Sequence, residues 1–359
     1  MINKYSNSYS LPSPKHQQGL ALISVLLIFA IVAVLAGSMI ERQSLDIQRS
    51  GNLQALQQAR AYSTGIEYAV RTGLQLDFED NKTVDHLLEE WAKEHTYPLT
   101  PGLAHIKIFD AQARFNLNSL HPSASNKDVQ LQRFRNLLAE LGLDEGIAMN
   151  TAKFMDKDSQ SDDEYLSAEV PYRSSYNLFK HPSELLLVAL VDADSYRLLM
   201  PYISTLPITA TLNVNTASNI VLSTLSNNLS IEEADKVISA RGEKGFQDVN
   251  EFWALQEIEP FTKQDSNQGD QNQESKNQKV VWDKTDFSVN SEYFEVFAKV
   301  ELADRIATIE MLLYRNAETG KMRTYYRDFS RTEARVPATS STNNSNNGNQ
   351  SRANNGSNP

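Results

Sequence analysis

The chain contains 359 residues, of which 40% are hydrophobic, and it carries a net charge of −11. This length accommodates two domains with hydrophobic cores as well as appendages, and the acidic balance disfavours binding to phosphate backbones or anionic lipid headgroups. Cysteine is absent, which excludes disulfides and thiolate metal sites.

The composition also lacks the residues of a catalytic centre. The six histidines are scattered along the chain, and no glycine-rich phosphate-binding loop is found. Metalloenzymes, thiol enzymes and nucleotide-binding proteins all require such residues. The sequence therefore predicts a protein that is not an enzyme.

The first predicted element is an uncharged apolar stretch from Leu20 to Ile40, whose only polar side chain before Ser38 is Ser24. At a rise of about 1.5 Å per residue it forms a helix of roughly 30 Å, the thickness of the hydrocarbon core of a bilayer. Apolar residues cover every face of this helix, as expected for a helix in lipid. The sequence therefore predicts a transmembrane helix at residues 20–40.

A helical pattern continues beyond this stretch, because no proline occurs between Pro14 and Pro98. Apolar and small side chains recur at steps of three and four, which predicts one helical face that extends out of the membrane. We expect this face to bind partner helices. Its predicted contact residues are Leu53, Leu56, Tyr62 and Ile66.

The leader before the apolar stretch is short and polar, carries Lys4 and Lys15, and ends at Gly19. Such a leader, followed by an apolar and then an amphipathic half-helix, resembles a type IV prepilin-like protein. The resemblance implies that prepilin peptidase cleaves the chain between Gly19 and Leu20. It also implies a single-pass protein of the inner membrane, with the bulk of the chain in the periplasm.

Ser24 occupies the fifth position of the mature chain, where most pilin-like subunits carry glutamate. In that family the glutamate pairs with the N-terminal amine of a neighbouring subunit, because a lone carboxylate in lipid costs about 2.5–3.5 kcal/mol. Its absence resembles the large minor pseudopilin K of type II secretion systems. The resemblance implies a protein that caps the tip of the periplasmic pseudopilus and helps to initiate its assembly. The implied partners are the smaller I-type and J-type minor pseudopilins, prepilin peptidase and the inner-membrane secretion platform.

Two alternative interpretations of the N-terminal segment remain open. Residues 34–36, before Gly37, form an acceptable signal-peptidase site, and cleavage there would release a secreted periplasmic protein. Against this, the apolar stretch exceeds the length of about 7–15 residues usual for a signal peptide, and its leader is only weakly basic. The other alternative is a plain membrane anchor that is never cleaved.

A β-hairpin is predicted from the alternation at Ile106 and Ile108, which resumes at Phe115 and Leu117. The pattern from residue 121 to residue 285 is then mainly helical. The FNLNSL segment at residues 115–120 resembles the place in the large minor pseudopilin where a large insertion interrupts the pilin sheet. We therefore expect an inserted helical domain at residues 121–285.

An acidic cluster within this region is a candidate metal site. Crowded carboxylates repel one another unless a cation neutralises them, and an oxygen-rich site suits Ca²⁺. The cluster is not an EF-hand, because serines (Ser161 and Ser167) replace its invariant glycine and its bidentate glutamate. The resemblance supports structural calcium, because the family's insertion carries calcium-binding acids before a similar PYR segment (residues 171–173). A solvated acidic loop remains the alternative. The candidate ligands are Asp156, Asp158, Asp162, Asp163 and Glu164.

Residues 211–253 resemble a helix-hairpin-helix repeat of DNA-binding proteins, through the NVNTA segment at 213–217 and the closing Gly245 and Phe246. The turn at residues 226–230 contains no glycine, although a phosphate-binding turn needs positive φ and close backbone approach. Acidic residues also outnumber basic ones in this segment. We interpret it as a structural hairpin and expect no nucleic-acid binding. A membrane-tethered DNA-uptake module is the alternative function.

Alternating segments near the C-terminus predict strands from Tyr293 to Glu301, from Ile306 to Tyr314 and around residues 322–330. The expected fold class is α+β, with a pilin-like long N-terminal helix packed on a small antiparallel sheet and a large all-α domain inserted into that sheet. The predicted divisions are a leader at 1–19, a transmembrane helix at 20–40, the first part of the pilin-like domain at 41–120, the inserted domain at 121–285, the second part of the sheet at 286–330 and a disordered tail at 331–359.

Overall fold

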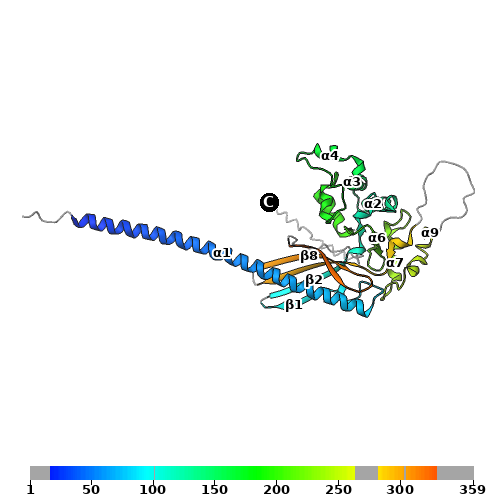
Figure 1. Cartoon of the computed structure of the whole chain (residues 1–359), viewed down its shortest axis with the longest axis horizontal. Helices are drawn as coiled ribbons and strands as arrows, with labels where there is room; N and C mark the ends of the chain where they lie inside the picture. The colour runs from blue at the N-terminus through cyan, green and yellow to red at the C-terminus, as the bar shows by residue number, and fades with distance from the viewer. Residues whose placement is uncertain (1–16, 101, 263–281, 303–304, 330–359) are drawn as a thin grey trace, which may run out of the picture. The chain divides into compact units, whose positions relative to one another are not determined.

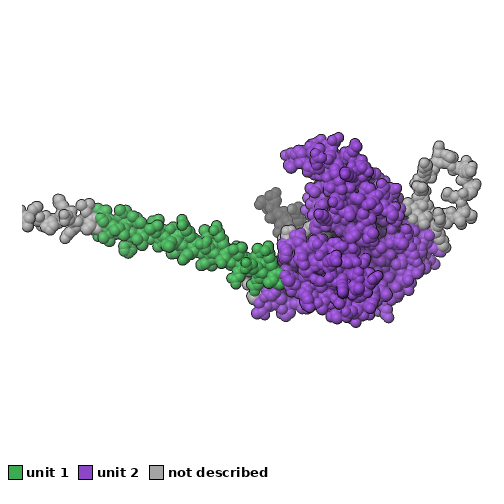
Figure 2. Space-filling model, viewed as in Figure 1, with its two compact units in different colours: residues 1–61 green, residues 62–359 purple. Residues whose placement is uncertain are grey.

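The computed structural model describes residues 17–100, 102–262, 282–302 and 305–329. Most of the predicted leader and the predicted tail lie outside the described residues. The chain divides into two compact units, residues 1–61 and residues 62–359 (Figure 2).

The first unit consists of the N-terminal part of one long helix, α1 (Gln17–Asp80). Its apolar side chains are exposed, and they include Phe29, Val34 and Ile40. The helix carries an 18-residue window with a mean hydropathy of 2.8, none of which is buried within the chain. By length and composition, α1 can cross a membrane.

The second unit contains a five-stranded antiparallel sheet with the order β1-β2-β7-β8-β9 (Figure 1). Strand β2 pairs with β7 over a long register in which Ile106 lies opposite Ala298, and Ala298 lies opposite Ile309 on β8. All three side chains are buried. The predicted C-terminal strands are therefore confirmed. The strands are β1 (His95–Leu99), β2 (Gly102–Asp110), β7 (Tyr293–Leu302), β8 (Arg305–Arg315) and β9 (Met322–Asp328).

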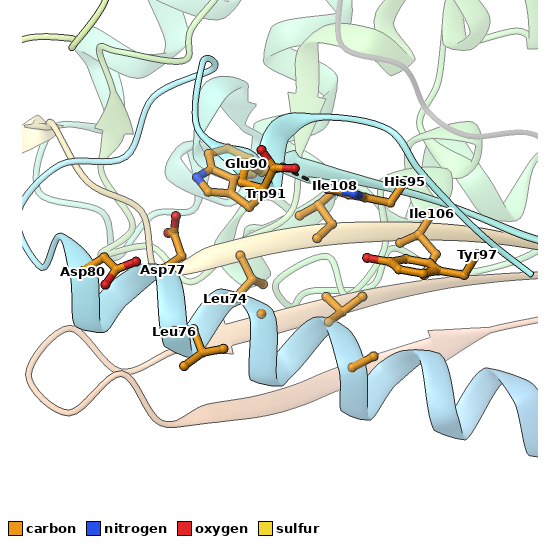
Figure 3. A pocket seen from close by; sticks show the side chains of 13 residues that line it. Leu74, Leu76, Asp77, Asp80, Glu90, Trp91, His95, Tyr97, Ile106 and Ile108 are labelled. Carbon is orange, nitrogen blue, oxygen red and sulfur yellow. Dashed lines mark hydrogen bonds between the residues drawn. The ribbon is translucent and has the colours of Figure 1, made fainter.

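The C-terminal turns of α1 lie along this sheet (Figure 3). Their buried residues, Ile66, Val70, Leu74 and Phe78, recur every four positions, which places them on one helical face. The turn between β8 and β9 closes against the helix, because a Cβ on Gly320 would lie 2.5 Å from the Phe78 ring. Burial of this apolar face stabilises the contact between helix and sheet by roughly 1.5–3 kcal/mol per large side chain.

Polar contacts fix the same helix against the edge strand β9. The Glu67 carboxylate accepts hydrogen bonds from Arg327 Nε at 2.6 Å and from the Thr324 hydroxyl at 2.6 Å. Arg71 donates to the carbonyl oxygen of Met322 at 2.7 Å. The Arg327 guanidinium lowers the pKa of the Glu67 carboxyl, so this ion pair is present at neutral pH.

Between the adjacent strands β2 and β7 lies a mainly helical stretch, residues 111–292, which we call the inserted stretch. It also contains two short parallel strand pairs, β3 with β4 and β5 with β6. Its α-helices are α2 (Lys127–Glu140), α3 (Gly146–Met155), α4 (Asp162–Leu166), α5 (Ala193–Leu199), α6 (Asn219–Ser223), α7 (Ile231–Ala240), α8 (Val249–Trp253) and α9 (Glu259–Thr262). Its strands are β3 (Phe115–Asn116), β4 (Ile203–Ser204), β5 (Leu212–Asn213) and β6 (Phe287–Ser288). The 3₁₀ helices among the described residues are η1 (Glu90–Ala92), η2 (Ala111–Ala113), η3 (Leu117–Leu120), η4 (Lys157–Ser159), η5 (Pro182–Leu187), η6 (Met200–Tyr202) and η7 (Lys284–Asp286).

The inserted stretch has two hydrophobic cores. The first helical core spans residues 115–203, and within it the rings of Phe115 and Phe134 stack at 5.0 Å. The second helical core takes residues between 214 and 289 together with Val84. The single helical domain expected at residues 121–285 therefore contains two separately packed parts.

The predicted hairpin through Ile108 and Phe115 is wrong. Strand β2 ends at Asp110, whose side chain accepts a hydrogen bond from Gln112 N at 2.8 Å and starts the 3₁₀ helix η2. Phe115 then pairs in parallel with Ile203. The alternation at Phe115 reflects its burial in the first helical core instead of a return along β2.

Candidate functional site

The predicted peptidase site lies in the first turns of α1, which contain Gly19 and Leu20. Ser24 follows on the same helix, among the exposed apolar side chains that begin at Leu22. The helix carries no acidic residue in its first turn. The position at which related subunits carry glutamate is therefore uncharged here.

The predicted partner face is only partly exposed. Leu53 and Leu56 are 62% and 47% exposed, as expected for contact residues. Tyr62 is half-buried and donates a hydrogen bond to the carbonyl oxygen of Thr100 at 2.7 Å. Ile66 is 6% exposed and packs within the chain, so its prediction as a partner contact is wrong. Periodicity alone could not distinguish a face that binds a partner from one that binds the chain's own sheet.

The acidic cluster forms the loop between α3 and α4 and the start of α4. Asp156 caps η4 by accepting from Asp158 N at 2.9 Å. Asp162 accepts from Ser174 N and from Arg173 Nη1, each at 3.1 Å, so it ties the PYR segment to α4. Two of the five predicted ligands thus serve the local fold.

The other three predicted ligands, Asp158, Asp163 and Glu164, are exposed. Within this loop, all of which is described, no three acids place ligand oxygens within 4.8 Å of one another. The structure therefore places the predicted ligands on one loop without assembling them around a point.

The helix-hairpin-helix-like unit consists of α6 and α7 joined by the turn at residues 226–230. Ser230 begins α7 with a capping box, in which its hydroxyl accepts from Glu233 N and the Glu233 carboxylate accepts from Ser230 N. No residue in this turn has a positive φ. The turn therefore lacks the backbone conformation of a phosphate-binding nest, and the DNA-uptake alternative is not favoured.

The NVNTA segment has a structural role that its sequence does not reveal. The Asn213 side chain donates to Asp110 Oδ2 at 3.0 Å and to Ser291 Oγ at 2.8 Å, and the Thr216 hydroxyl donates to Asp110 Oδ2 at 2.5 Å. Asn215 accepts from Phe246 N at 2.7 Å. These contacts fasten the second helical core to the end of β2. We call the set Asp110, Asn213, Thr216 and Ser291 the base network.

A second polar group lies where α1 ends. The carboxylates of Asp77, Asp85 and Glu89 each place an oxygen within 4.8 Å of the others. Asp85 pairs with Arg315 Nη2 at 2.5 Å, and Asp77 lies 3.6 Å from Arg315 Nη1. Burial, together with the charges of Glu89 and Asp85, raises the pKa of Asp77 to about 7. We call these three acids the α1-end acids.

Sequence reasoning missed both the base network and the α1-end acids. Asp85 and Glu89 lie near Asp77 in the chain, but Arg315 and Ser291 are more than two hundred residues away. A local sequence pattern cannot predict contacts between residues that are so far apart in the chain. The nearest sequence signal was the unusual density of acids between Asp77 and Glu90.

The fold and the N-terminal helix together define a pilin-like protein: a long helix, apolar in its N-terminal part, whose C-terminal turns pack on an antiparallel sheet. Two family models, both described as Type II secretion system (T2SS), protein K, match residues 113–208 and 212–270. The first model spans the first helical core, and the second begins just before the second helical core, whose last residues, Trp282, Phe287 and Val289, lie beyond it.

Known proteins are similar over most of the chain. Type II secretion system protein K of Pseudomonas aeruginosa is 34% identical over 90% of this chain and 96% of its own length. The protein K of Aeromonas hydrophila is 30% identical over 66% of this chain and 80% of its own length. A solved chain of the GspK-GspI-GspJ complex from the type 2 secretion system of enterotoxigenic Escherichia coli matches the fold, with a TM-score of 0.64 and 24% identity over 79% of this chain and 100% of that chain. The chain belongs to the type II secretion system protein K family and is a minor pseudopilin.

The base network predicts a large effect for Asp110→Ala. The substitution leaves Asn213, Thr216 and Ser291 with buried donors that have lost their shared acceptor, which should lower the free energy of unfolding by about 3 kcal/mol or more. Thermal unfolding of the full chain in detergent should show a melting temperature several degrees lower. The exposed Glu243→Ala is the matched control and should change stability by less than about 0.5 kcal/mol. Equal melting temperatures for the two variants would contradict the role of the network.

Proposed function

We propose that this minor pseudopilin caps the tip of the periplasmic pseudopilus and helps to initiate its assembly for protein export across the outer membrane. The observation that carries the proposal is Ser24 within an uncharged apolar helix. A subunit inside a pilin-like filament uses a carboxylate at this position to pair with a neighbour's amine, because a buried charge requires a partner. A subunit at the tip has no such neighbour to pair with.

The size of the inserted stretch supports the same position. Both helical cores are added between two neighbouring strands of the sheet, and α3 and α4 lie well away from that sheet (Figure 1). Repeated at every rise of a filament, bulges of this size would collide with one another. At the end of a filament they meet no neighbour above them. We take the inserted stretch to be a domain added to a pilin-like body.

The proposed partners are smaller minor pseudopilins of the I and J types. The similar solved chain is part of a complex whose description names GspI and GspJ beside GspK. On this chain the exposed Leu53 and Leu56 supply an apolar helical surface in a segment that precedes the sheet contacts of α1. Packing against another amphipathic helix would bury this surface. We propose in addition that prepilin peptidase removes the leader after Gly19 and that the subunit meets the secretion platform at the inner membrane.

We also propose that the acidic cluster binds Ca²⁺ as a structural ion. Asp158 lies in the loop before α4, Asp163 and Glu164 lie in the first turn of α4, and all three are exposed, so their oxygens are available to one ion. Gln160 in this loop already has a left-handed backbone, with φ of 52°. An ion that binds only the ordered loop would stabilise this conformation.

The partner surface predicts that Leu56→Asp disrupts co-purification with I-type and J-type pseudopilins. A charge at this position would have to be buried without a counter-charge, which should weaken association at least tenfold. The control is Gln54→Asp, which introduces the same charge at an exposed position on another face of the helix. Co-purification that survives Leu56→Asp would contradict the proposed surface.

The calcium proposal predicts local protection of the loop. In hydrogen exchange of the full chain, peptides covering residues 156–173 should exchange several-fold more slowly with calcium than with chelator. Combining Asp158→Asn with Asp163→Asn should remove this difference, because these exposed acids have no hydrogen-bonding role in the loop comparable to that of Asp156 or Asp162. Equal exchange of the wild-type loop in the two conditions would show that it is an ordinary solvated loop.

A further inference from the structure

The α1-end acids stand apart from the acidic cluster of the inserted stretch and connect three elements. Asp77 belongs to the last turn of α1, Asp85 to the following loop, and Glu89 precedes η1. One oxygen from each lies within 4.8 Å of the other two. Like charges at this separation repel strongly wherever water is scarce.

The surrounding positive charge does not balance these acids. In the part of the chain that the structure describes, their ion pairs come from Arg315 and, when it is protonated, from His86, which lies 3.9 Å from Glu89. With all three acids ionised, three carboxylates face one guanidinium and leave an excess of negative charge. Asp80 adds to it at the same end of α1.

The buried carboxylate of Asp85 provides an independent indication of a missing ligand. Its residue is 1% exposed, and its Oδ2 accepts from Arg315 Nη2 and from Ser291 N. Its Oδ1 is buried without a hydrogen-bond partner. A buried carboxylate oxygen is almost always satisfied by a donor or a cation, so this atom can accept a ligand, although Arg315 Nη1 is also buried without a hydrogen-bond partner.

Of the three acids, Asp77 lines a pocket of about 300 Å³, through which solvent reaches its carboxylate (Figure 3). Asp77, Asp80 and Glu90 line one part of this pocket, and Leu74, Trp91 and Ile108 line the rest. The acidic part attracts cations. An ion can therefore reach Asp77 and keep several waters as ligands.

We propose that Asp77, Asp85 and Glu89 bind one divalent cation of the hard, oxygen-preferring class, of which Ca²⁺ is the natural example. Three carboxylates supply the charge, and waters of the pocket complete a shell of about six to eight oxygens. The ion joins the last turn of α1 to the loop before η1. Through the Asp85 pair with Arg315, it also reaches the end of β8. This site stabilises the junction of helix and sheet and is distinct from the loop at residues 156–164.

Terbium luminescence tests the proposal, because Tb³⁺ replaces Ca²⁺ in oxygen sites and emits when a nearby tryptophan is excited. The Trp91 indole donates to Glu89 Oε2 at 2.7 Å, so an ion held by Glu89 would lie next to this ring. Chelator-treated full chain in detergent should show tryptophan-excited Tb³⁺ emission that saturates and is displaced by excess Ca²⁺. Trp91→Phe should remove most of this emission, although Trp253 and Trp282 remain.

Substitutions of Asp77 and Glu89 test whether the emission comes from an ion at these acids. Asp77→Asn and Glu89→Gln keep the size of each side chain and should lower the emission at least tenfold. Both replaced residues are less buried than Asp85, so these variants are the ones expected to fold, and their melting temperatures without metal verify this. Glu243→Gln, at an exposed acid outside both acidic groups, is the control and should leave the emission unchanged.

Three results would overturn the proposal. One is the absence of saturable emission from the wild-type chain. Another is emission from Asp77→Asn or Glu89→Gln that equals that of the wild type. The third is emission that persists in Trp91→Phe, which would place the ion elsewhere.

Discussion

Asp110 ends β2, and its buried carboxylate accepts hydrogen bonds from Thr216 and Ser291, which lie at the beginning and the end of the second helical core. This interaction fixes where the inserted stretch leaves and rejoins the sheet. Because β2 and β7 are neighbours in the sheet, any displacement of Ser291 would also displace the start of β7. Desolvation of Asp110 raises its pKa to about 6, and hydrogen bonds from Ser291, Thr216 and Gln112 offset part of that cost. The placement of the second helical core thus depends on one satisfied buried acid.

The packing of α1 on the sheet also decides which part of this helix can bind other molecules. The apolar face of α1 that includes Ile66 packs on the chain's own sheet, so the exposed apolar surface of the helix lies mainly in its earlier part. An uncharged N-terminal helix with Ser24 suits a subunit that needs no counter-charge from a neighbour. The large insertion suits a subunit with nothing above it. Ser24 and the inserted stretch lie in different units of the chain, and both favour the proposed position at the tip.

Elements with a strong local pattern could be predicted from the sequence. The apolar helix, the strands at 293–302 and 305–315, and the helices on either side of Gly142 follow from periodicity and from that glycine, which adopts the positive φ of a helix end. The predictions that failed concern residues whose contacts lie far away in the sequence. Phe115 alternates like a strand residue, yet its partner is Ile203. Ile66 carries the same periodicity as Leu56 but is buried, and the pairing of Asp85 with Arg315 has no trace in either local segment.

The central claim is that the subunit occupies the tip of the pseudopilus, and locating it on assembled filaments tests this most directly. Immunogold labelling against an epitope in the exposed segment around Asp163 should place gold at filament ends, with few copies per filament. Antibody against the major subunit should label the shaft and so show that the whole filament is accessible. Gold against this protein scattered along the filament shaft would contradict the account.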